Sequence, residues 1–367
     1  MVERAALAEG NQERLQKVFK KAESGERIVL GVIGGSITEG AACSKPDKRY
    51  HGVMLSWWRK SFPKSECVLV NAGIGATASN YGAMRLERDL LSKKPDLVVL
   101  EYAVNDRSAK EFAESYEGMV RQILNSPSKP ALVLLFMARR KASDSAQEWQ
   151  AKIGSHYNLP MVSYRDALLP EIDAQKLKWE QFSADSVHPN ERGHTLAGQL
   201  LCAFLQKALS AYASGKTVAQ KEPALPAPLI SSRFESCRLL DGEDMKLAAN
   251  QGWAYDGSSK RSAGWKSCAP GSTMEMETEG ECIFISYWRI KGPMGMVSVS
   301  VDGGNPVKFD SFFEETWGGY RHMEQVAAGL APGKHKVKIE LLQERNPKSS
   351  GNEFRVLCIG SAGAKGT

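Results

Sequence analysis

The chain has 367 residues, long enough for two domains, and its 42% hydrophobic and 25% charged residues are typical of a globular protein with a packed core. The formal net charge is only +6 and no Lys/Arg block alternates with aromatic residues, so nucleic acid is not an expected partner. No run approaches 18 apolar residues, so a membrane-spanning helix is not expected either.

The start of the chain and its cysteines bear on the cellular compartment. Met1-Val2-Glu3-Arg4 lacks the basic and then apolar pattern of a secretory signal. The seven cysteines are odd in number, scattered and without a CxxC pair, so neither zinc ligation nor dithiol redox chemistry is expected. This cysteine usage favours a reducing compartment, and we expect a cytoplasmic protein.

Residues 27–213 alternate between short apolar runs and amphipathic stretches. A helix is predicted over 11–22, and the apolar runs that follow are 28–33, 67–71, 96–102, 131–137 and a weaker 160–164. Further helices are predicted over 53–62, 80–91, 110–124, 143–157 and 191–212. Runs that are apolar throughout indicate strands covered on both faces, so this region predicts a parallel sheet flanked by helices.

The pattern changes at residues 221–232, a proline-rich stretch that cannot continue a helix and that we interpret as an interdomain linker. Runs with period-two alternation follow at 282–288, 296–301 and 335–341, separated by the turn signals DGGN at 302–305 and APGK at 331–334. The sequence therefore predicts a first domain over 1–220 and an all-β sandwich or jelly roll over 233–367.

Three polar motifs begin where predicted strands end. Ser36 follows the first strand in a Gly-Gly-Ser turn, Gly73-Ile74-Gly75-Ala76-Thr77 follows the second, and Asn105-Asp106 follows the third. The loops at the carboxyl ends of parallel strands line the ligand crevice of an open sheet, so these motifs are expected to converge on one edge. His188, from the loop before the last helix, would have to fold back over the same edge.

These residue types fit acyl transfer. A serine in a glycine-rich turn is a candidate nucleophile, and His188, three residues after Asp185, supplies a base together with a carboxylate that holds its tautomer. The backbone N–H groups of Ser36 and Gly75 and the side-chain amide of Asn105 are candidate donors to the oxyanion. The sequence therefore predicts an esterase with Ser36, Asp185 and His188 as its catalytic residues.

Each motif alone also has a structural interpretation. The Gly-Gly-Ser turn could hold a phosphate, although no GxxxxGK[ST] or GxGxxG pattern follows it. Gly73 and Gly75 could serve a tight turn, Asn105-Asp106 could form a turn or cap, and Asn190 could be the N-cap of the following helix. The combination of the motifs, in this order and on one edge, is what favours an active site.

The motifs around Ser36, Gly75, Asn105 and His188 resemble the four blocks of the SGNH (GDSL-type) hydrolases over residues 27–213. The resemblance implies a three-layer, flavodoxin-like α/β fold and a reaction that needs no cofactor or catalytic metal. It also implies Ser36 as nucleophile, His188 as base and Asp185 as its orienting acid, with Gly75 and Asn105 completing the oxyanion hole.

Two positions depart from the pattern of that family. Gly35 stands where many members have Asp, a change that should leave the nucleophile intact. Val104 replaces the usual Gly before the asparagine of the third block. The geometry of the loop that carries Asn105 therefore does not follow from the resemblance.

The second domain narrows the substrate. It carries four of the eight tryptophans, Trp253, Trp265, Trp288 and Trp317, and for any one of them a place in the core is the first expectation. Trp317 is the exception, because its polar and glycine neighbours indicate an exposed loop from which the ring could stack on a sugar. An SGNH domain followed by a jelly roll resembles the two-domain carbohydrate esterases that remove acetyl groups from plant oligosaccharides, and we expect Trp317 to reach toward the substrate.

The leading hypothesis is therefore a carbohydrate O-acetylesterase that acts on acetylated oligosaccharides through an acetyl-enzyme intermediate. One alternative is a lipid or thioester acylhydrolase, which would need a long apolar groove that the sequence does not indicate. Another is a carbohydrate-binding protein with an inactive hydrolase domain, against which the intact set of five site residues speaks. The sequence specifies neither the sugar nor the oligomeric state.

Overall fold

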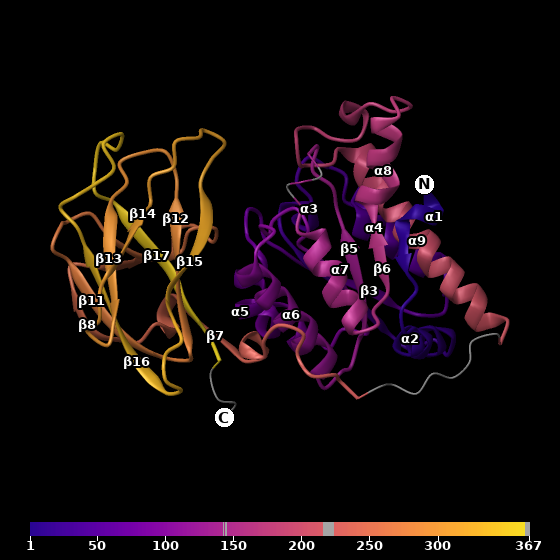
Figure 1. The fold of residues 1–367 in the computed structure, drawn as a ribbon, viewed down its shortest axis with the longest axis horizontal. Coiled ribbons are helices and arrows are strands. Elements are labelled where there is room, and N and C mark those ends of the chain that lie inside the picture. The colour runs from indigo at the N-terminus through magenta and orange to yellow at the C-terminus, as the bar shows by residue number, and fades with distance from the viewer. Residues whose placement is uncertain (142, 144, 216–223, 364–367) are drawn as a thin grey trace. The chain divides into compact units, whose positions relative to one another are not determined.

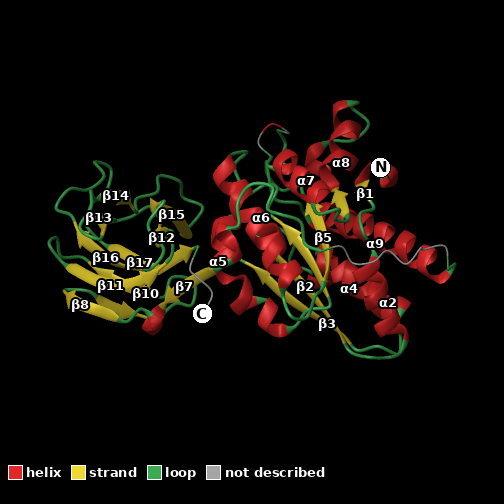
Figure 2. Cartoon of the chain, turned by 60° about the horizontal axis from the view of Figure 1, so that its bottom comes forward, coloured by secondary structure: helices red, strands yellow, loops and turns green. Residues whose placement is uncertain are grey.

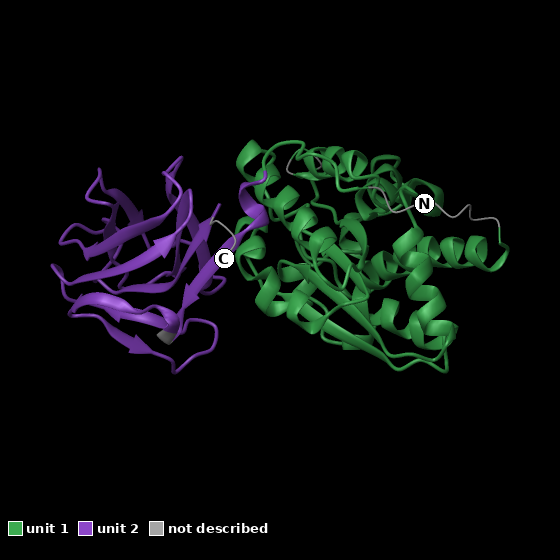
Figure 3. Cartoon of the chain, turned by 90° about the horizontal axis from the view of Figure 1, so that it is seen from below, with its two compact units in different colours: residues 1–231 green, residues 232–367 purple. Residues whose placement is uncertain are grey.

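The computed structural model describes residues 1–141, 143, 145–215 and 224–363. Within these residues the chain forms two compact units, 1–231 and 232–367 (Figure 3). Part of the expected linker, residues 221–223, lies outside the described residues, and so do residues 216–220 at the end of the expected first domain. The remaining linker residues up to 231 belong to the first unit.

The first unit is built on a six-stranded sheet (Figures 1 and 2). Its strands are β1 (Ala6–Ala8), β2 (Ile28–Gly34), β3 (Cys67–Gly73), β4 (Leu97–Glu101), β5 (Ala131–Phe136) and β6 (Met161–Ser163). Their spatial order is β1-β6-β5-β4-β2-β3, and all pairs are parallel except β1 with β6. The five parallel strands thus have the order 2-1-3-4-5 of the flavodoxin-like fold that the family resemblance implied.

Helices cover both faces of this sheet, which explains why its strands are apolar throughout (Figures 1 and 2). On one face lie α2 (Glu13–Glu23), α4 (Tyr50–Ser61) and α9 (Glu191–Ala213), with a continuous core beneath them that includes Phe19 and Trp58. On the other lie α5 (Ser79–Asp89), α6 (Lys110–Asn125) and α7 (Gln147–His156). The predicted three-layer α/β fold is confirmed.

The structure also contains elements that the sequence analysis missed. In the first unit these include α1 (Val2–Ala5), the antiparallel edge strand β1, and α8 (Tyr164–Asp173), which carries Pro170 inside the helix. A proline in a helix interior normally breaks the pattern, and three residues of strand are too few to show a period. Helix α7 begins at Gln147 rather than at 143, and Asp144 of the expected helix lies outside the described residues.

The second unit consists of two antiparallel sheets whose inner faces share one core (Figure 1). The six strands of the first sheet are β7 (Cys237–Asp241), β9 (Ala254–Asp256), β10 (Gly264–Ser267), β12 (Cys282–Arg289), β15 (Tyr320–Ala328) and β17 (Phe354–Ala362). The second sheet contains β8 (Leu247–Gln251), β11 (Thr273–Glu279), β13 (Met296–Val301), β14 (Val307–Asp310) and β16 (Lys334–Leu341). The predicted all-β sandwich is confirmed, and side chains of β13 and β16 alternate between buried and more exposed positions as expected.

No helix among the described residues is long and apolar enough to cross a membrane. Of the seven cysteines, all of which lie within the described residues, only Cys268 is exposed.

Candidate active site

The three predicted catalytic residues meet at the carboxyl edge of the parallel sheet. Ser36 is the first residue of α3 (Ser36–Glu39), the short helix that directly follows β2. His188 lies in the loop before α9, and its Nε2 is 2.9 Å from Ser36 Oγ. The other ring nitrogen, Nδ1, is 2.7 Å from Asp185 Oδ2. The structure therefore joins the three side chains in the order serine, histidine, carboxylate.

The loop that presents His188 is held by its own hydrogen bonds. Oδ1 of Asp185 accepts the N–H groups of Val187 and His188, each at 2.7 Å, and the Asp185 carbonyl accepts the indole N–H of the buried Trp179 at 2.6 Å. Partial burial would raise the pKa of Asp185, but the hydrogen bonds from the His188 ring and from the two backbone N–H groups outweigh it and lower the pKa. Asp185 thus stays ionised and fixes the ring of His188.

The helix after His188, α9, begins with Asn190 as its N-cap, as the structural interpretation of this motif predicted. The side chain of Asn190 accepts the N–H groups of Arg192 and Gly193, so Asn190 is the N-cap of α9. The cap fixes the start of α9 at Glu191, three residues after His188. The two interpretations of this motif are therefore compatible, since the same turn caps the helix and supports the histidine.

The predicted oxyanion donors come from three adjacent strands, because β3, β2 and β4 are neighbours in the sheet. A Cβ on Gly75 would lie 3.7 Å from Ser36 Cβ, so the turn after β3 passes close to the hydroxyl. Within the described residues, neither the N–H of Ser36 nor that of Gly75 has a hydrogen-bond acceptor. Both donors are therefore available to a bound group.

Gly35 and Asn105 are packed against each other. A Cβ at position 35 would overlap the side-chain amide of Asn105, so an aspartate could not occupy this position without moving the amide. The loop that carries Asn105 is a tight turn in which the N–H groups of Asn105 and Asp106 both reach the carbonyl of Tyr102 at 3.0 Å. Val104 is buried in that turn and does not have a positive φ, so glycine is not required there.

Asp106 connects the Asn105 loop with the Gly75 loop. Its buried carboxylate accepts the N–H of Ser79 at the start of α5, at 2.8 Å, and the side-chain amide of Gln150 at 3.0 Å. Burial raises the pKa of Asp106 to about 7, against the effect of those hydrogen bonds. Asp106 is not the N-cap residue of a helix, but its carboxylate binds the first N–H group of α5 and so connects the loop that carries Asn105 to the segment that follows Gly75.

The sequence analysis missed the buried polar groups beneath α3. Thr38 Oγ1 lies 3.0 Å from the hydroxyl of Tyr50 and 3.3 Å from Oε2 of Glu101. Burial raises the pKa of Glu101 to about 8, and nearby Asp106 adds to the rise, so this carboxyl is largely protonated at neutral pH. The available signal was a carboxyl residue at the end of a strand that is otherwise wholly apolar.

Two buried histidines, also missed, lie behind the same helix. The Nε2 of His51 is 3.2 Å from the side-chain amide of Asn71, and the Nε2 of His194 is 3.2 Å from the carbonyl of Ala41. Burial lowers the pKa of each histidine to about 4. Both rings are neutral at physiological pH, and Nδ1 of His194 also accepts the N–H of Tyr50 at 3.5 Å.

Trp317 lies in the second unit, on the loop before β15, and is 60% exposed, whereas the other seven tryptophans are buried or half-buried. Its ring stacks on Tyr320 at 5.2 Å between centroids and meets the edge of Phe313 at 4.9 Å. Gly318 adopts φ +109°, and Gly319 packs on Trp288 where a Cβ would clash. The loop therefore presents one aromatic ring to solvent and supports it from behind.

No group of three or more His, Cys, Asp or Glu side chains placed to hold a metal ion occurs in the part of the chain that the structure describes.

Comparison with known proteins gives a family and two solved structures. Residues 32–196 match the model of the GDSL-like lipase/acylhydrolase family. The chain is 31% identical to a two-domain esterase (CEX) active on acetylated mannans, co-crystallized with mannopentaose, with a TM-score of 0.90 and coverage of 100% of this chain and 99% of that one. A second structure of a two-domain esterase (CEX) active on acetylated mannans gives 32% identity, a TM-score of 0.91 and the same coverage. No curated protein matches the chain.

Proposed function

The chain belongs to the GDSL-like lipase/acylhydrolase family, and from this premise we propose that it is a serine esterase that removes O-acetyl groups from mannan-type oligosaccharides. The observation that carries the proposal is the chain of two short contacts from Ser36 Oγ through His188 to Asp185, beside two backbone N–H groups without acceptors. This arrangement supplies a nucleophile, a base and oxyanion donors at one point.

In the first half of the proposed reaction, Ser36 Oγ attacks the acetyl carbonyl while His188 Nε2 takes the hydroxyl proton. The negative charge on the carbonyl oxygen is stabilised by the N–H groups of Ser36 and Gly75 and by the amide of Asn105. Asp185 keeps Nδ1 of His188 protonated, so that Nε2 is free to accept. The tetrahedral intermediate then collapses, the sugar oxygen leaves with the proton from His188, and the acetyl group stays on Ser36.

In the second half, a water molecule replaces the sugar. His188 Nε2 removes a proton from this water as it attacks the acetyl-enzyme, and the same donors stabilise the second oxyanion. Collapse of this intermediate returns the proton to Ser36 Oγ and releases acetic acid, which then loses its own proton to solvent and becomes acetate.

The position of Glu39 beside Ser36 favours a neutral substrate over an anionic one. It is exposed, lies on α3 three residues after Ser36, and its Oε2 is 2.6 Å from where a Cβ of Gly75 would be. A carboxylate at the entrance to the nucleophile repels the phosphates of an acyl-CoA or a phospholipid. The hydroxyl groups of a sugar, in contrast, can donate hydrogen bonds to it.

The second unit supports a saccharide as the alcohol part of the ester. The exposed ring of Trp317, backed by Tyr320 and Phe313, offers a flat apolar surface of the kind on which a sugar ring stacks. We propose that Trp317 binds a sugar unit of the substrate, so that binding energy from a distant ring helps to position the scissile ester.

A release assay tests the proposal. The protein is given acetylated mannan oligosaccharides, p-nitrophenyl esters of increasing chain length, and acetyl-CoA, and acetate or thiol release is measured. We expect turnover of the acetylated oligosaccharides and a preference for acetyl over longer aryl esters. Faster turnover of octanoyl than of acetyl esters, or efficient cleavage of acetyl-CoA, would favour the lipid or thioester acylhydrolase instead. Binding of mannan without any ester hydrolysis would favour an inactive carbohydrate-binding protein.

A further inference from the structure

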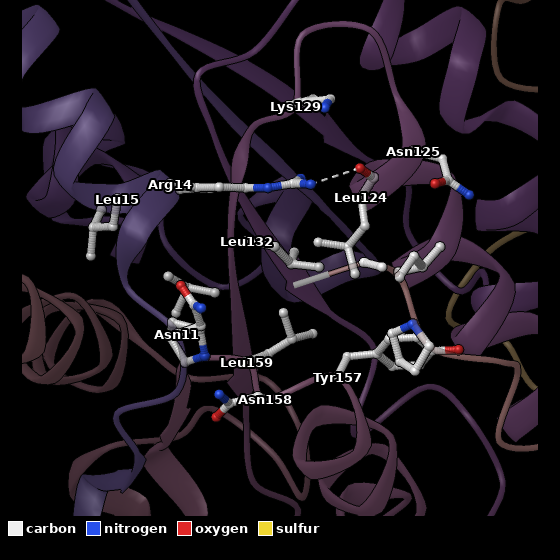
Figure 4. Close-up of a pocket in the computed structure, with 16 residues that line it drawn as sticks. Asn11, Arg14, Leu15, Leu124, Asn125, Lys129, Leu132, Tyr157, Asn158 and Leu159 are labelled. Atoms are coloured by element: carbon white, nitrogen blue, oxygen red, sulfur yellow. Dashed lines mark hydrogen bonds between the residues drawn. The ribbon is translucent and has the colours of Figure 1, made fainter. Parts of the chain in front are cut away.

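An arginine lies near each end of β5 and binds carbonyl groups of neighbouring segments. At the amino end, Arg14 donates to the carbonyls of Leu124 and Pro130 at 2.9 and 3.3 Å, beside a cavity of about 540 Å³ (Figure 4). Residues 131–133 of β5 line this cavity, so it lies at the amino edge of the sheet, opposite to Ser36. Arg14 therefore supports the end of α6 and the loop to β5, away from the active-site edge.

The second arginine, Arg139, lies three residues after the carboxyl end of β5 and binds the loop of a predicted oxyanion donor. Its Nε–H group donates to the carbonyl of Val104 at 2.8 Å. Val104 is buried and directly precedes Asn105. Because a peptide group is planar, a donor that fixes the Val104 carbonyl also fixes the N–H group and the Cα of Asn105. The positive charge of the guanidinium makes this bond stronger than one from a neutral donor.

The backbone carbonyls that precede Asn105 in its turn all accept hydrogen bonds. The carbonyl of Ala103 accepts the N–H of Ala146 at 2.9 Å, and the carbonyl before it closes the turn itself. The carbonyl of Val104 is bound by a side chain, that of Arg139, so this bond can be removed by a substitution that leaves the backbone groups in place.

The side-chain amide of Asn105 is oriented mainly by the backbone from which it projects. Its Oδ1 is buried and has no hydrogen-bond partner among the described residues. The amide packs against Gly35, where a Cβ would overlap it. Packing limits where the amide can lie, but a movement of its Cα would carry the amide along. Arg139 is the side chain that opposes such a movement.

Arg139 is itself fixed by the residue that follows it. The backbone N–H of Arg140 donates to the carbonyl of Ser186 at 2.9 Å, in the loop between Asp185 and His188. Arg139 is also half-buried. The two consecutive arginines thus contact the loop of the catalytic base through one backbone group and the loop of the oxyanion donor through one side chain.

We propose that Arg139 is a positioning residue that holds the side-chain amide of Asn105 in the oxyanion hole through the carbonyl of Val104. The inference rests on the proposed function, because it assigns Arg139 a part in the reaction. Its effect should appear in kcat and not in KM, since the amide stabilises charge that develops only in the transition state. A misplacement of about 1 Å can cost roughly 10²-fold in rate, so removal of this bond should be clearly measurable.

Kinetics on p-nitrophenyl acetate test the role in the reaction. Arg139→Met removes the donor but keeps a long side chain, and kcat should fall roughly 10- to 100-fold while KM stays within about twofold of the parent. In the Asn105→Ala background no amide remains to be positioned, so the same substitution should lower kcat by less than about twofold. An equal fold loss in the two backgrounds would overturn the proposal, because Arg139 would then act independently of Asn105.

Arg139→Gln separates the hydrogen bond from the charge. Its amide nitrogen stands the same number of bonds from the backbone as Nε of arginine, so it can donate to the Val104 carbonyl without a positive charge. We expect kcat to stay within roughly threefold of the parent, since the donor is kept. A fall of roughly tenfold or more in this variant would show that the hydrogen bond is not what matters, even if Arg139→Met fails to fold.

Hydrogen exchange tests the contact without reference to activity. In the full chain, mass spectrometry of peptides that cover the turn of Asn105 should show faster exchange in Arg139→Met than in the parent. Lys141→Met, at an exposed cation two residues away, should match the parent in exchange and in kcat. Arg14→Met should speed exchange at the end of α6 but leave kcat and the turn of Asn105 unchanged, because its carbonyl partners lie at the other edge.

The outcomes separate this inference from the proposed function. Unchanged exchange at the turn of Asn105 in Arg139→Met would overturn the positioning. Faster exchange with an unchanged kcat would also overturn it, because the bond would then serve the fold alone. If the parent hydrolyses none of the esters tested and the exchange still changes as expected, the placement of Asn105 by Arg139 stands and the proposed function fails.

Discussion

The two units differ in what they offer to a substrate. In the first unit, the side chains around Ser36 are held by partners at hydrogen-bond distance, and the groups they position are those that any ester needs: a nucleophile, a base and oxyanion donors. In the second unit, Trp317 offers only the face of a ring, supported by two other aromatic residues. Changes in the first unit should therefore affect every ester alike, and changes in the second should affect only substrates that carry a sugar.

The largest expected effect is the loss of the nucleophile. Ser36→Ala should lower kcat roughly 10⁴- to 10⁶-fold for aryl acetates and acetylated oligosaccharides alike, and His188→Ala should fall to a similar level because the two side chains act as one unit. Ser44→Ala, at an exposed hydroxyl in the following loop, is the matched control and should be fully active. Substantial turnover by Ser36→Ala would mean that another residue is the nucleophile.

Loss of the orienting carboxylate should be severe but smaller. Asp185→Asn keeps the size of the side chain but places an amide against Nδ1 of His188, which favours the wrong tautomer, so we expect kcat to fall roughly 10³- to 10⁴-fold with measurable residual activity. Asp173→Asn, an exposed carboxylate at the end of α8, is the control. If Asp185→Asn retained near-parental rates on p-nitrophenyl acetate, Asp185 would be only a loop-stabilising residue.

The oxyanion donor from the third block gives the next smaller effect. Asn105→Ala should lower kcat roughly 10²- to 10³-fold on both substrate types, since one donor to the oxyanion is lost while the other two remain. Asn125→Ala, an exposed asparagine at the opposite edge of the sheet, should have no effect on either substrate. A rise in KM at constant kcat for Asn105→Ala would instead assign this side chain to ground-state binding.

Histidines give the two units opposite expected responses to pH. His51 and His194 in the first unit have pKa values lowered by burial to about 4. As pH falls, these histidines are protonated in the unfolded chain before they are protonated in the folded one. Their contribution to the free energy of unfolding is therefore complete above about pH 6.5 and is lost as pH falls toward 4. Treated as independent groups, each histidine accounts for a loss of about 3 kcal/mol.

His335 in the second unit has the opposite charge preference. Burial lowers the pKa of His335, but hydrogen bonds to the Asp302 carboxylate at 2.6 Å and to the carbonyl of Ala331 at 2.8 Å outweigh it and raise the pKa. Its contribution is complete below about pH 6.5 and is lost as pH rises through the raised pKa. Thermal unfolding of the full chain between pH 4 and 9, with proteolysis to identify which unit opens, measures both responses. If the stability of the first unit at about pH 4.5 equalled its stability at neutral pH, the assignment of His51 and His194 as neutral buried histidines would be wrong.

The sequence could predict the residues that meet at the edge of the sheet, but not the buried residues that support them. Ser36, Gly75, Asn105 and His188 could be assigned to one site from their positions in the chain, because each directly follows or precedes a recognisable element and parallel strands end at one edge. The strand pattern was equally readable, since both faces of the sheet are covered and the runs are apolar throughout.

The supporting residues could not be predicted in the same way. The contact of Thr38 with Glu101 joins residues 63 positions apart, and that of Glu117 with Ile230 joins residues 113 positions apart. A buried carboxyl group has no periodic signature, and its partner is set by packing that only the folded chain defines. The contacts of residues 226–231 with α6 could not be predicted for a further reason, because a proline-rich composition is shared by free linkers and by segments whose backbone is bound.

The smallest expected effect is also the most selective. Trp317→Ala should reduce kcat/KM for acetylated mannan oligosaccharides by about 1–1.5 kcal/mol, or roughly five- to twelvefold, because an aromatic platform for a sugar ring is removed. An aryl acetate has no ring to place there, so its kcat/KM should not change. The measurement is the ratio of the two constants in the parent and in the variant.

Tyr255→Ala is the matched control for this substitution. Tyr255 is a second exposed aromatic side chain of the same unit, 39% exposed on β9, so its removal tests whether any exposed ring contributes. If only Trp317→Ala changes the ratio, the sugar contact is specific to the loop before β15. If kcat/KM falls equally for the two substrates, Trp317 stabilises its unit through Tyr320 and Phe313. The proposal that changes in the second unit affect only substrates that carry a sugar would then be wrong. A fall in the oligosaccharide constant that disappears on short acetylated sugars would place the ring of Trp317 at a distance of several sugar units from the ester, because binding energy from a distant ring can act only when the substrate is long enough to reach both sites.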